Sequence, residues 1–371
     1  MTNSDHNLPK NFLYLKIYSI LLIILTPIDY LLFLSWIETM KNYLWYSSSL
    51  VFPFFSILFF SLGTSWFFYK NKISHTNKLN QKDIIKLSIL DGLSSQISSF
   101  SIPFLSVVSI TILDKLTLPL NMLVSKVYLK KVYFKNHYLS LFLTIYAIMI
   151  TFIPSFQENR DNYWWAIILY ILSIFPSVGS FVYKDKLLVQ PINIWWMNTY
   201  ISIWQFIFGL FLLPLMFIPV GIKNLNYIPP SEFMDYMRDG SKCQFLGINS
   251  RDKDECQLSF LLMMSYQIIS TLINIIMFEI IKHGSSTYFI LINCLKIPIQ
   301  FWLGSIKSLA GENYSPVNIN NLFTAILLIV SILVYNDTPE GTETNHQFNS
   351  LDYNELNDNN LPGDELQTFT I

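Results

Sequence analysis

Long apolar stretches alternate with short polar segments along most of this chain. A helix that spans a membrane needs about 20 apolar residues, and by that measure the pattern predicts ten spanning helices. The expected ranges are 15–36, 49–69, 84–102, 104–128, 138–156, 163–183, 194–219, 258–281, 286–308 and 318–335. The pattern therefore predicts an all-α membrane protein.

The composition agrees with that prediction. Of 371 residues, 52% are hydrophobic and only 13% are charged, whereas a soluble domain has roughly 25% charged residues. Such a chain cannot cover its surface with charge, so its first partner is the lipid bilayer. The formal net charge is −1. We expect no nucleic-acid partner and no cofactor.

Loop lysines set the expected orientation, since lysine accumulates in short cytoplasmic loops. With a cytoplasmic N-terminal tail at 1–14, both termini are cytoplasmic and the 220–257 loop is lumenal. Residues 336–371 carry eight acids and no Lys or Arg, a composition that predicts a disordered cytoplasmic tail. The lysines on the expected cytoplasmic side are Lys70, Lys72, Lys78, Lys82, Lys130, Lys131, Lys135, Lys184, Lys186 and Lys282.

Two polar stripes interrupt otherwise apolar helices, and steps of 3, 4 and 4 place each stripe on one helix face. The first stripe is Asp114, Thr117, Asn121 and Ser125. The second is Asn293, Lys296, Gln300 and Gly304. The two superimpose at an offset of 179 residues, which also sets Pro119 on Pro298. Polar residues inside a membrane tend to face a bundle interior or a water-filled path.

Other features extend this correspondence. The spacing of Asp91, Ser95 and Ser98 is repeated in another set, Gln267, Thr271 and Asn274. Helices 1 and 6 each contain a central proline, Pro27 and Pro176. The chain is thus interpreted as two five-helix repeats, 15–156 and 163–335. Five is odd, so the second repeat enters the membrane inverted.

This arrangement predicts a transport pathway between the repeats. Helices 3, 4, 8 and 9 are expected to line a cavity, with the four prolines as flex points, although proline is also common in membrane helices for packing alone. Asp114 and Lys296 form either a plain interhelical ion pair or, with Lys115, groups that bind a solute or carry a proton. Asp29 is a further acid inside a predicted helix.

Two further features concern the polar segments. Cys243 and Cys256 close a short stretch of the lumenal loop, which predicts a disulfide in an oxidising lumen; two free thiols would fit a cytosolic loop instead. Cys294, inside helix 9, is interpreted as a small packing residue. In the tail, Tyr353 and Leu356 form a Tyr-x-x-Leu motif of the kind that clathrin adaptors read for endolysosomal sorting, though such short motifs also arise by chance.

With these residues in view, the chain resembles the chloroquine-resistance-transporter-like family of the drug/metabolite transporter superfamily. The resemblance is carried by KLTLPLNM from Lys115 to Met122, by STYFILINCLKIP from Ser286 to Pro298, and by Gly311-Glu312. It implies an inverted-repeat carrier of a vacuolar or endolysosomal membrane. Such a carrier would move amino acids, peptides or weakly basic organic solutes out of the lumen down a proton gradient, contributing to solute and osmotic balance.

The chain departs from the family pattern at two lysines. Lys115 and Lys296 stand where the family has glutamine, which would weaken affinity for cations and favour carboxylate-bearing substrates. A transport-inactive scaffold or sensor that keeps the fold is the alternative. An enzyme is not expected, because all five histidines lie in tails or at loop edges and no Cys/His cluster has the spacing of a metal site.

Overall fold

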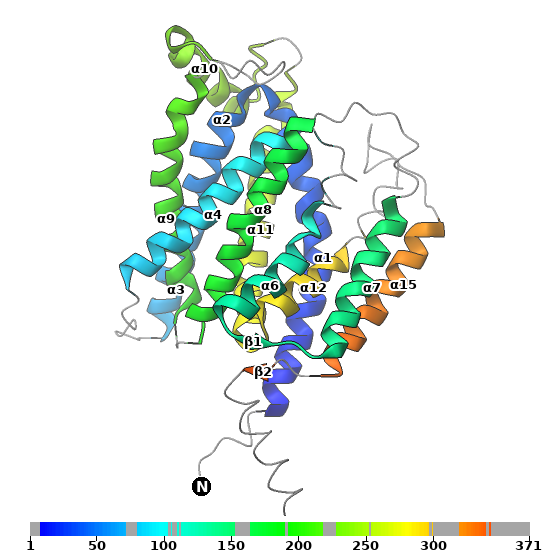
Figure 1. The fold of residues 1–371 in the computed structure, drawn as a ribbon. Helices are drawn as coiled ribbons and strands as arrows, with labels where there is room; N and C mark the ends of the chain where they lie inside the picture. The colour runs from blue at the N-terminus through cyan, green and yellow to red at the C-terminus, as the bar shows by residue number, and fades with distance from the viewer. Residues whose placement is uncertain are drawn as a thin grey trace, which may run out of the picture.

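The computed structural model describes residues 8–71, 80–102, 105, 110, 113–152, 164–189, 192–217, 228–251, 254–296, 299, 319–338 and 341–342. Apart from two strands of two residues each, the regular secondary structure of the described chain is helical (Figure 1). Its longer helices are α1 (Leu8–Thr39), α3 (Phe52–Asn71), α4 (Gln81–Ser101), α6 (Thr117–Tyr128), α7 (Lys135–Phe152), α8 (Trp164–Leu187), α9 (Ile194–Leu212), α11 (Ser259–His283), α12 (Ser286–Cys294) and α15 (Ile319–Asn336).

Shorter elements connect these helices. They are η1 (Lys41–Tyr43), α2 (Leu44–Tyr46), η2 (Ser47–Val51), β1 (Lys131–Val132), η5 (Leu213–Phe217), η6 (Pro230–Glu232), α10 (Phe233–Ser241), η7 (Lys242–Leu246), η8 (Cys256–Leu258) and β2 (Gly341–Thr342). Strands β1 and β2 pair antiparallel. The prediction of a helical membrane protein is therefore confirmed in outline, with this small ladder as an addition to the all-α class.

Four stretches within the described residues are long and apolar enough to cross a membrane. They are Tyr14–Thr39, Lys41–Tyr69, Trp164–Leu187 and Cys256–His283. Each of the ten predicted ranges overlaps one of the longer helices, and parts of the ranges 104–128 and 286–308 lie outside the described residues. The layout of ten spanning helices in two inverted repeats stays a prediction.

Side chains that precede the apolar runs determine where several helices begin. Asn80 Oδ1 accepts the backbone N–H of Lys82 at 3.2 Å before α4. Asn193 Oδ1 accepts that of Trp196 at 3.1 Å before α9, and Ser285 Oγ accepts that of Tyr288 at 3.0 Å before α12. Each side chain satisfies one of the N–H groups that a helix start leaves without a partner.

The helices pack as antiparallel or crossing neighbours far apart in sequence, chiefly α1 with α11, α4 with α8, α3 with α9, and α7 with α15 (Figure 1). The α7–α15 pair stands at one edge of the bundle. It is held by hydroxyls: Ser331 Oγ lies 2.9 Å from Ser140 Oγ and 2.8 Å from Thr144 Oγ1. Exposed Phe142 and Leu333 suit contact with lipid.

Three of the four predicted flex-point prolines lie in the described chain. Pro27 and Pro176 lie inside α1 and α8. Pro119 lies in the first turn of α6, where a missing N–H is tolerated. The carbonyl that Pro119 would normally bond, that of Lys115, accepts the N–H of Leu118 at 3.2 Å instead. Helix 4 was expected to run unbroken over 104–128, but residues 115–116 form a turn. Pro298 lies outside the described residues.

The segment between α9 and α11 forms a cap on the end of α1, at the opposite end of the bundle from β1 and β2 (Figure 1). Cys243 and Cys256 are joined by a disulfide, so that prediction is confirmed. Both cysteines are buried against Trp36 and Tyr236 in a cluster of aromatic side chains. Gln244 adds hydrogen bonds, accepting from Trp36 Nε1 at 3.0 Å.

Asp254 fastens this cap to the turn after α1. Its carboxylate accepts Asn42 Nδ2 at 2.7 Å, Tyr43 OH at 2.9 Å, and the N–H groups of Arg251 and Ser250 at 2.8 and 3.1 Å. Burial alone would raise the pKa of Asp254. These hydrogen bonds stabilise the charged form and hold its pKa below the ordinary value.

Candidate functional site

A cluster of three charged side chains lies where α6 begins and α12 ends. Asp114 Oδ2 lies 3.3 Å from Lys115 Nζ and 3.5 Å from Lys296 Nζ, so one carboxylate contacts both ammonium groups. The Lys115 side chain is 3% exposed, that of Lys296 18% and that of Asp114 34%. We call these three residues the charged triad. The predicted interhelical pair is present, and it includes a second lysine.

Two buried oxygens lie near Lys296 of the triad: the Asp29 carboxylate interacts with the charge of Lys296, and Asn293 precedes Lys296 by three residues. Asp29 Oδ1 and Asn293 Oδ1 are buried and have no hydrogen-bond partner among the described residues. Cys294 is fully buried and its Sγ donates to the Ile290 carbonyl at 3.3 Å, as expected for a packing residue. A buried group without a partner is costly, so these oxygens mark places where a polar solute or water would be stabilised.

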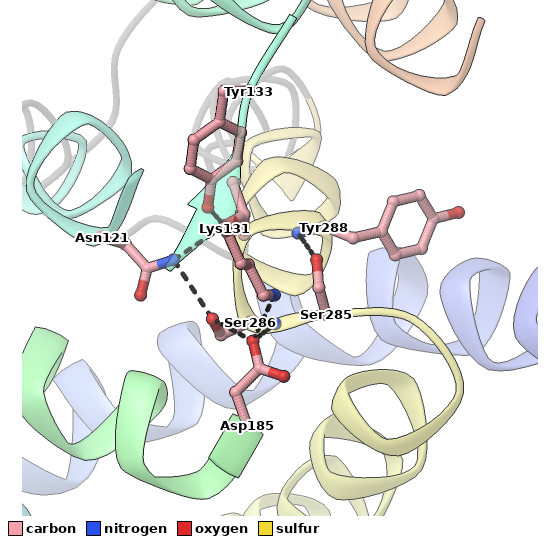
Figure 2. Close-up of polar contacts among 8 residues, drawn as sticks. Asn121, Lys131, Tyr133, Asp185, Ser285, Ser286 and Tyr288 are labelled. Atoms are coloured by element: carbon pink, nitrogen blue, oxygen red, sulfur yellow. Dashed lines mark hydrogen bonds and ion pairs between the residues drawn. The ribbon is translucent and has the colours of Figure 1, made fainter. Parts of the chain in front are cut away.

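Asn121, the third member of the first stripe, lies outside the triad. It is fully buried, and its Nδ2 donates to Ser286 Oγ at 3.2 Å and to Thr287 Oγ1 at 3.0 Å in the first turn of α12 (Figure 2). Thr287 Oγ1 also lies 3.0 Å from Tyr133 OH. Asn121 therefore joins α6 to α12 at the end of the bundle near β1.

Beside it, one carboxylate oxygen gathers three donors. Asp185 Oδ2 lies 2.7 Å from Lys131 Nζ, and it accepts the Ser286 N–H at 3.0 Å and the Ser286 Oγ–H at 2.8 Å (Figure 2). The negative charge suits the positive N-terminal end of α12. We call Lys131, Asp185 and Ser286 the α12 latch.

The other predicted cavity residues are dispersed. Asp91 of α4 pairs with Lys184 Nζ of α8 at 2.9 Å and accepts a short hydrogen bond from Ser180. Gln267 of α11 donates to Ser56 Oγ of α3 at 2.9 Å. The predicted cavity-lining set is thus divided among several helix interfaces.

The remaining candidates make local contacts or lie outside the described chain. Thr271 Oγ1 donates to the Gln267 carbonyl and Asn274 Nδ2 to the Ser270 carbonyl, both within α11. Thr117 is buried, whereas Ser95 is exposed. Gln300, Tyr353 and Leu356 fall outside the described residues.

Sequence reasoning missed the α12 latch and misplaced Lys184. Lys131 and Lys184 were assigned to cytoplasmic loops, but Lys184 lies in the last turn of α8, is 4% exposed and is paired with Asp91. Asp185, also in the last turn of α8, is not among the residues that the sequence analysis singles out. The run Lys184-Asp185-Lys186 at the end of an otherwise apolar helix was the sequence signal for buried ion pairs at this position.

Comparison with known proteins identifies the relatives of this chain. Crt homolog 1 of Dictyostelium discoideum is 23% identical over 256 residues, which cover 60% of this chain and 52% of that protein. The chloroquine resistance transporter of Toxoplasma gondii is 20% identical over 337 residues, covering 86% of this chain and 37% of that protein. That of Plasmodium vivax (strain Salvador I) is 25% identical over 210 residues, covering 53% and 49%.

In these three comparisons the chain matches about half the relative's length or less. The family comparison covers far more of the chain. Residues 15–335 match a family described as CRT-like, chloroquine-resistance transporter-like, and that range includes the charged triad, the α12 latch and the disulfide. The chain therefore belongs to the CRT-like family.

Proposed function

We propose that this protein is a carrier of small charged or polar organic solutes in a vacuolar or endolysosomal membrane. In this proposal ten helices span the bilayer as two inverted five-helix repeats, with both termini in the cytoplasm and the disulfide-bonded cap in the lumen. Family membership and the named transporters among its relatives support transport.

The observation that carries the proposal is the ion pair between Asp114 and Lys296. Asp114 and Lys296 belong to the two polar stripes, which superimpose at an offset of 179 residues along the chain. In the folded protein the two side chains meet inside an apolar bundle. Polar and charged groups are expensive in a membrane unless they are paired or functional. Here the carboxylate is shared by two lysines, so the triad alone carries an excess positive charge.

That charge pattern suggests the class of solute. A carboxylate on the solute would compete with Asp114 for Lys115 or Lys296, and an ammonium group would compete with the lysines for Asp114. Amino acids and peptides carry both groups. Weakly basic organic solutes would use Asp114 alone and face repulsion from both lysines.

Proton coupling and sorting complete the proposal. Asp114 within the triad and Asp29, which interacts with the charge of Lys296, are the proposed proton carriers, because a change of partner changes how readily each carboxyl ionises. The tail motif at Tyr353 and Leu356 is proposed to bind a clathrin adaptor and direct the protein to the endolysosomal membrane.

The test is flux through the purified full chain in proteoliposomes with an acidic interior. Efflux of labelled amino acids, small peptides and a weak base is compared with and without the pH gradient. Asn121→Leu should abolish flux and Lys296→Gln should shift selectivity toward the weak base, because one positive charge is removed. Ser61→Leu is the matched control, since the Ser61 hydroxyl bonds only its own helix at Leu58 O and is exposed.

Flux that is absent for every solute in a correctly folded wild-type protein would reject the carrier and favour the scaffold or sensor. Wild-type flux and selectivity in both variants would mean that the polar stripes are packing faces.

A further inference from the structure

The chain that follows α15 folds back on the start of α7. Asn136 Nδ2 donates to Asp337 Oδ2 at 3.0 Å and to Thr338 Oγ1 at 2.7 Å. Further on, Gly341 pairs with Val132 and Thr342 with Lys131 in the β1–β2 ladder. We call the described residues Asp337, Thr338, Gly341 and Thr342 the strap. It begins the range for which the sequence predicts a disordered tail, yet its described residues are held by backbone and side-chain contacts.

His137 is the centre of this docking surface. The ring is fully buried and its Nδ1 accepts the Phe134 N–H at 2.9 Å, so in the neutral ring Nε2 carries the proton. Nε2 then donates to the Thr338 carbonyl at 2.9 Å. The ring also packs edge-on against Tyr335, with centroids 4.6 Å apart. One side chain thus caps α7 and binds the strap.

The strand that the strap pairs with is also part of the α12 latch. β1 contains Lys131, whose Nζ lies 2.7 Å from Asp185 Oδ2. Tyr133, directly after β1, contacts Thr287 in the first turn of α12 (Figure 2). Two side chains at β1 therefore hold the N-terminal end of α12, while the backbone of β1 is held by the strap.

The order of the elements along the chain couples the strap to the contacts between β1 and α12. β1 leads directly from α6, which carries Asn121, whereas the strap extends from α15, which is bound to α7 through hydroxyl contacts. A movement that carries α6 and β1 away from α12 while α7 and α15 stay in place has to separate β1 from the strap as well. The strap adds its own contacts to the free energy that keeps this end of the bundle closed.

We propose that the strap is an intramolecular brake: when docked on β1 and α7 it holds the α12 latch closed, and its release lets this end of the solute path open. The proposal rests on the proposed carrier function for its effect on flux. Its structural part, strengthening of the latch by the strap, stands independently of any transported solute.

Two truncated chains test the structural part in lipid nanodiscs. One ends at residue 342 and keeps the strap; the other ends at residue 336, where α15 ends. Both lack the acidic tail beyond, so they differ only in the strap. Hydrogen–deuterium exchange is measured at residues 286–294 and 128–133. We expect exchange about fivefold faster in the shorter chain, the change that loss of one hydrogen bond would give.

A point variant tests the same contact in the full chain. Asn136→Asp places a carboxylate against Asp337 and should reproduce the faster exchange, whereas Lys135→Ala, on the exposed neighbouring residue, should not. Protection of the buried Cys294 thiol from a maleimide dye confirms that each variant is folded. Equal exchange at the latch in the two truncated chains, or in Asn136→Asp and wild type, would overturn the proposal.

Flux separates this proposal from the carrier function. If both hold, the chain ending at 336 transports faster than the chain ending at 342. If no chain transports any solute while the exchange difference remains, the carrier proposal fails and the strap–latch coupling stands. If transport is present but exchange and flux are the same in both chains, the brake is rejected and the carrier stands.

Discussion

Asp114→Asn should destabilise this protein, because the substitution leaves two lysines without their shared counter-ion. Both ammonium groups contact the same carboxylate oxygen, at 3.3 and 3.5 Å, so they lie within about 7 Å of each other. At an effective dielectric constant of about 20, two positive charges at that distance repel by about 2 kcal/mol. Breaking a buried pair by removing one partner costs about 3–5 kcal/mol.

Partial exposure reduces that cost. The Asp114 side chain is 34% exposed, so we place the loss at the lower end, about 2–3 kcal/mol. At about 2–4 °C for each kcal/mol, the apparent Tm should fall by about 4–12 °C. Lys296→Gln added to Asp114→Asn should recover part of the loss, because only one buried charge then remains.

The assay uses a thiol that the protein already has. Of the three cysteines, two form the disulfide and Cys294 is buried beside Lys296, so a maleimide dye reacts only when the bundle opens. Dye fluorescence on heating gives the apparent Tm of wild type, both single variants and the double variant. An unchanged Tm for Asp114→Asn would show that the triad is solvated well enough to need no counter-ion. Strictly additive effects would show that Asp114 and Lys296 do not interact.

Three further outcomes are expected. Cys243→Ser combined with Cys256→Ser, which leaves no new thiol for the dye, should loosen the cap by about 3 kcal/mol, the value for a disulfide that closes about 15 residues, and raise proteolysis of the cap without opening the bundle at Cys294. Because the pKa of Asp254 is lowered in the folded protein, its contribution to cap docking is complete above the ordinary aspartate pKa of 3.8. That contribution is lost as the pH falls through the lower folded pKa. Asp254→Asn should therefore weaken cap docking equally at pH 7 and pH 5, as measured by hydrogen exchange. Ser331→Ala should cost about 1 kcal/mol of α7–α15 packing, measured as a lower apparent Tm.

Much of the fold could be predicted from the sequence because a helix that is buried in lipid requires a long run of apolar residues. A long apolar run must form a helix in a membrane, since its backbone has no water to bond. The disulfide could also be predicted, because Cys243 and Cys256 lie only 13 residues apart in one loop that the sequence predicts to be lumenal. Helix ends were harder. The turn at Lys115 and Leu116 comes before Pro119, and only the position of the proline hinted at it.

The site was predicted in part. Periodicity placed Asp114 and Lys296 on interior faces, and their contact is present. Periodicity also placed Asp91 and Gln267 on interior faces, but it could not say which interface each would enter. Asp91 pairs with Lys184 and Gln267 donates to Ser56, and helical periodicity identifies neither partner. A helical face predicts burial; the partner depends on how the helices pack in three dimensions.

The length of α12 links the two polar centres described above. The latch lies at its first residue, Ser286, and Lys296 of the triad follows two residues after its last, Cys294. Nine helical residues rise about 14 Å, and a helix this short moves as one body. In the proposed carrier, a tilt of α12 that frees Ser286 from Asp185 would also shift Lys296, two residues beyond the helix, relative to Asp114. The helices α6 and α12 are joined at both ends. At one end Asn121 of α6 contacts the first turn of α12, and at the other Asp114, just before α6, contacts Lys296, just after α12. Opening at the latch and rearrangement of the charges are then two parts of one movement, which is what a carrier requires if a bound solute is to control which end opens.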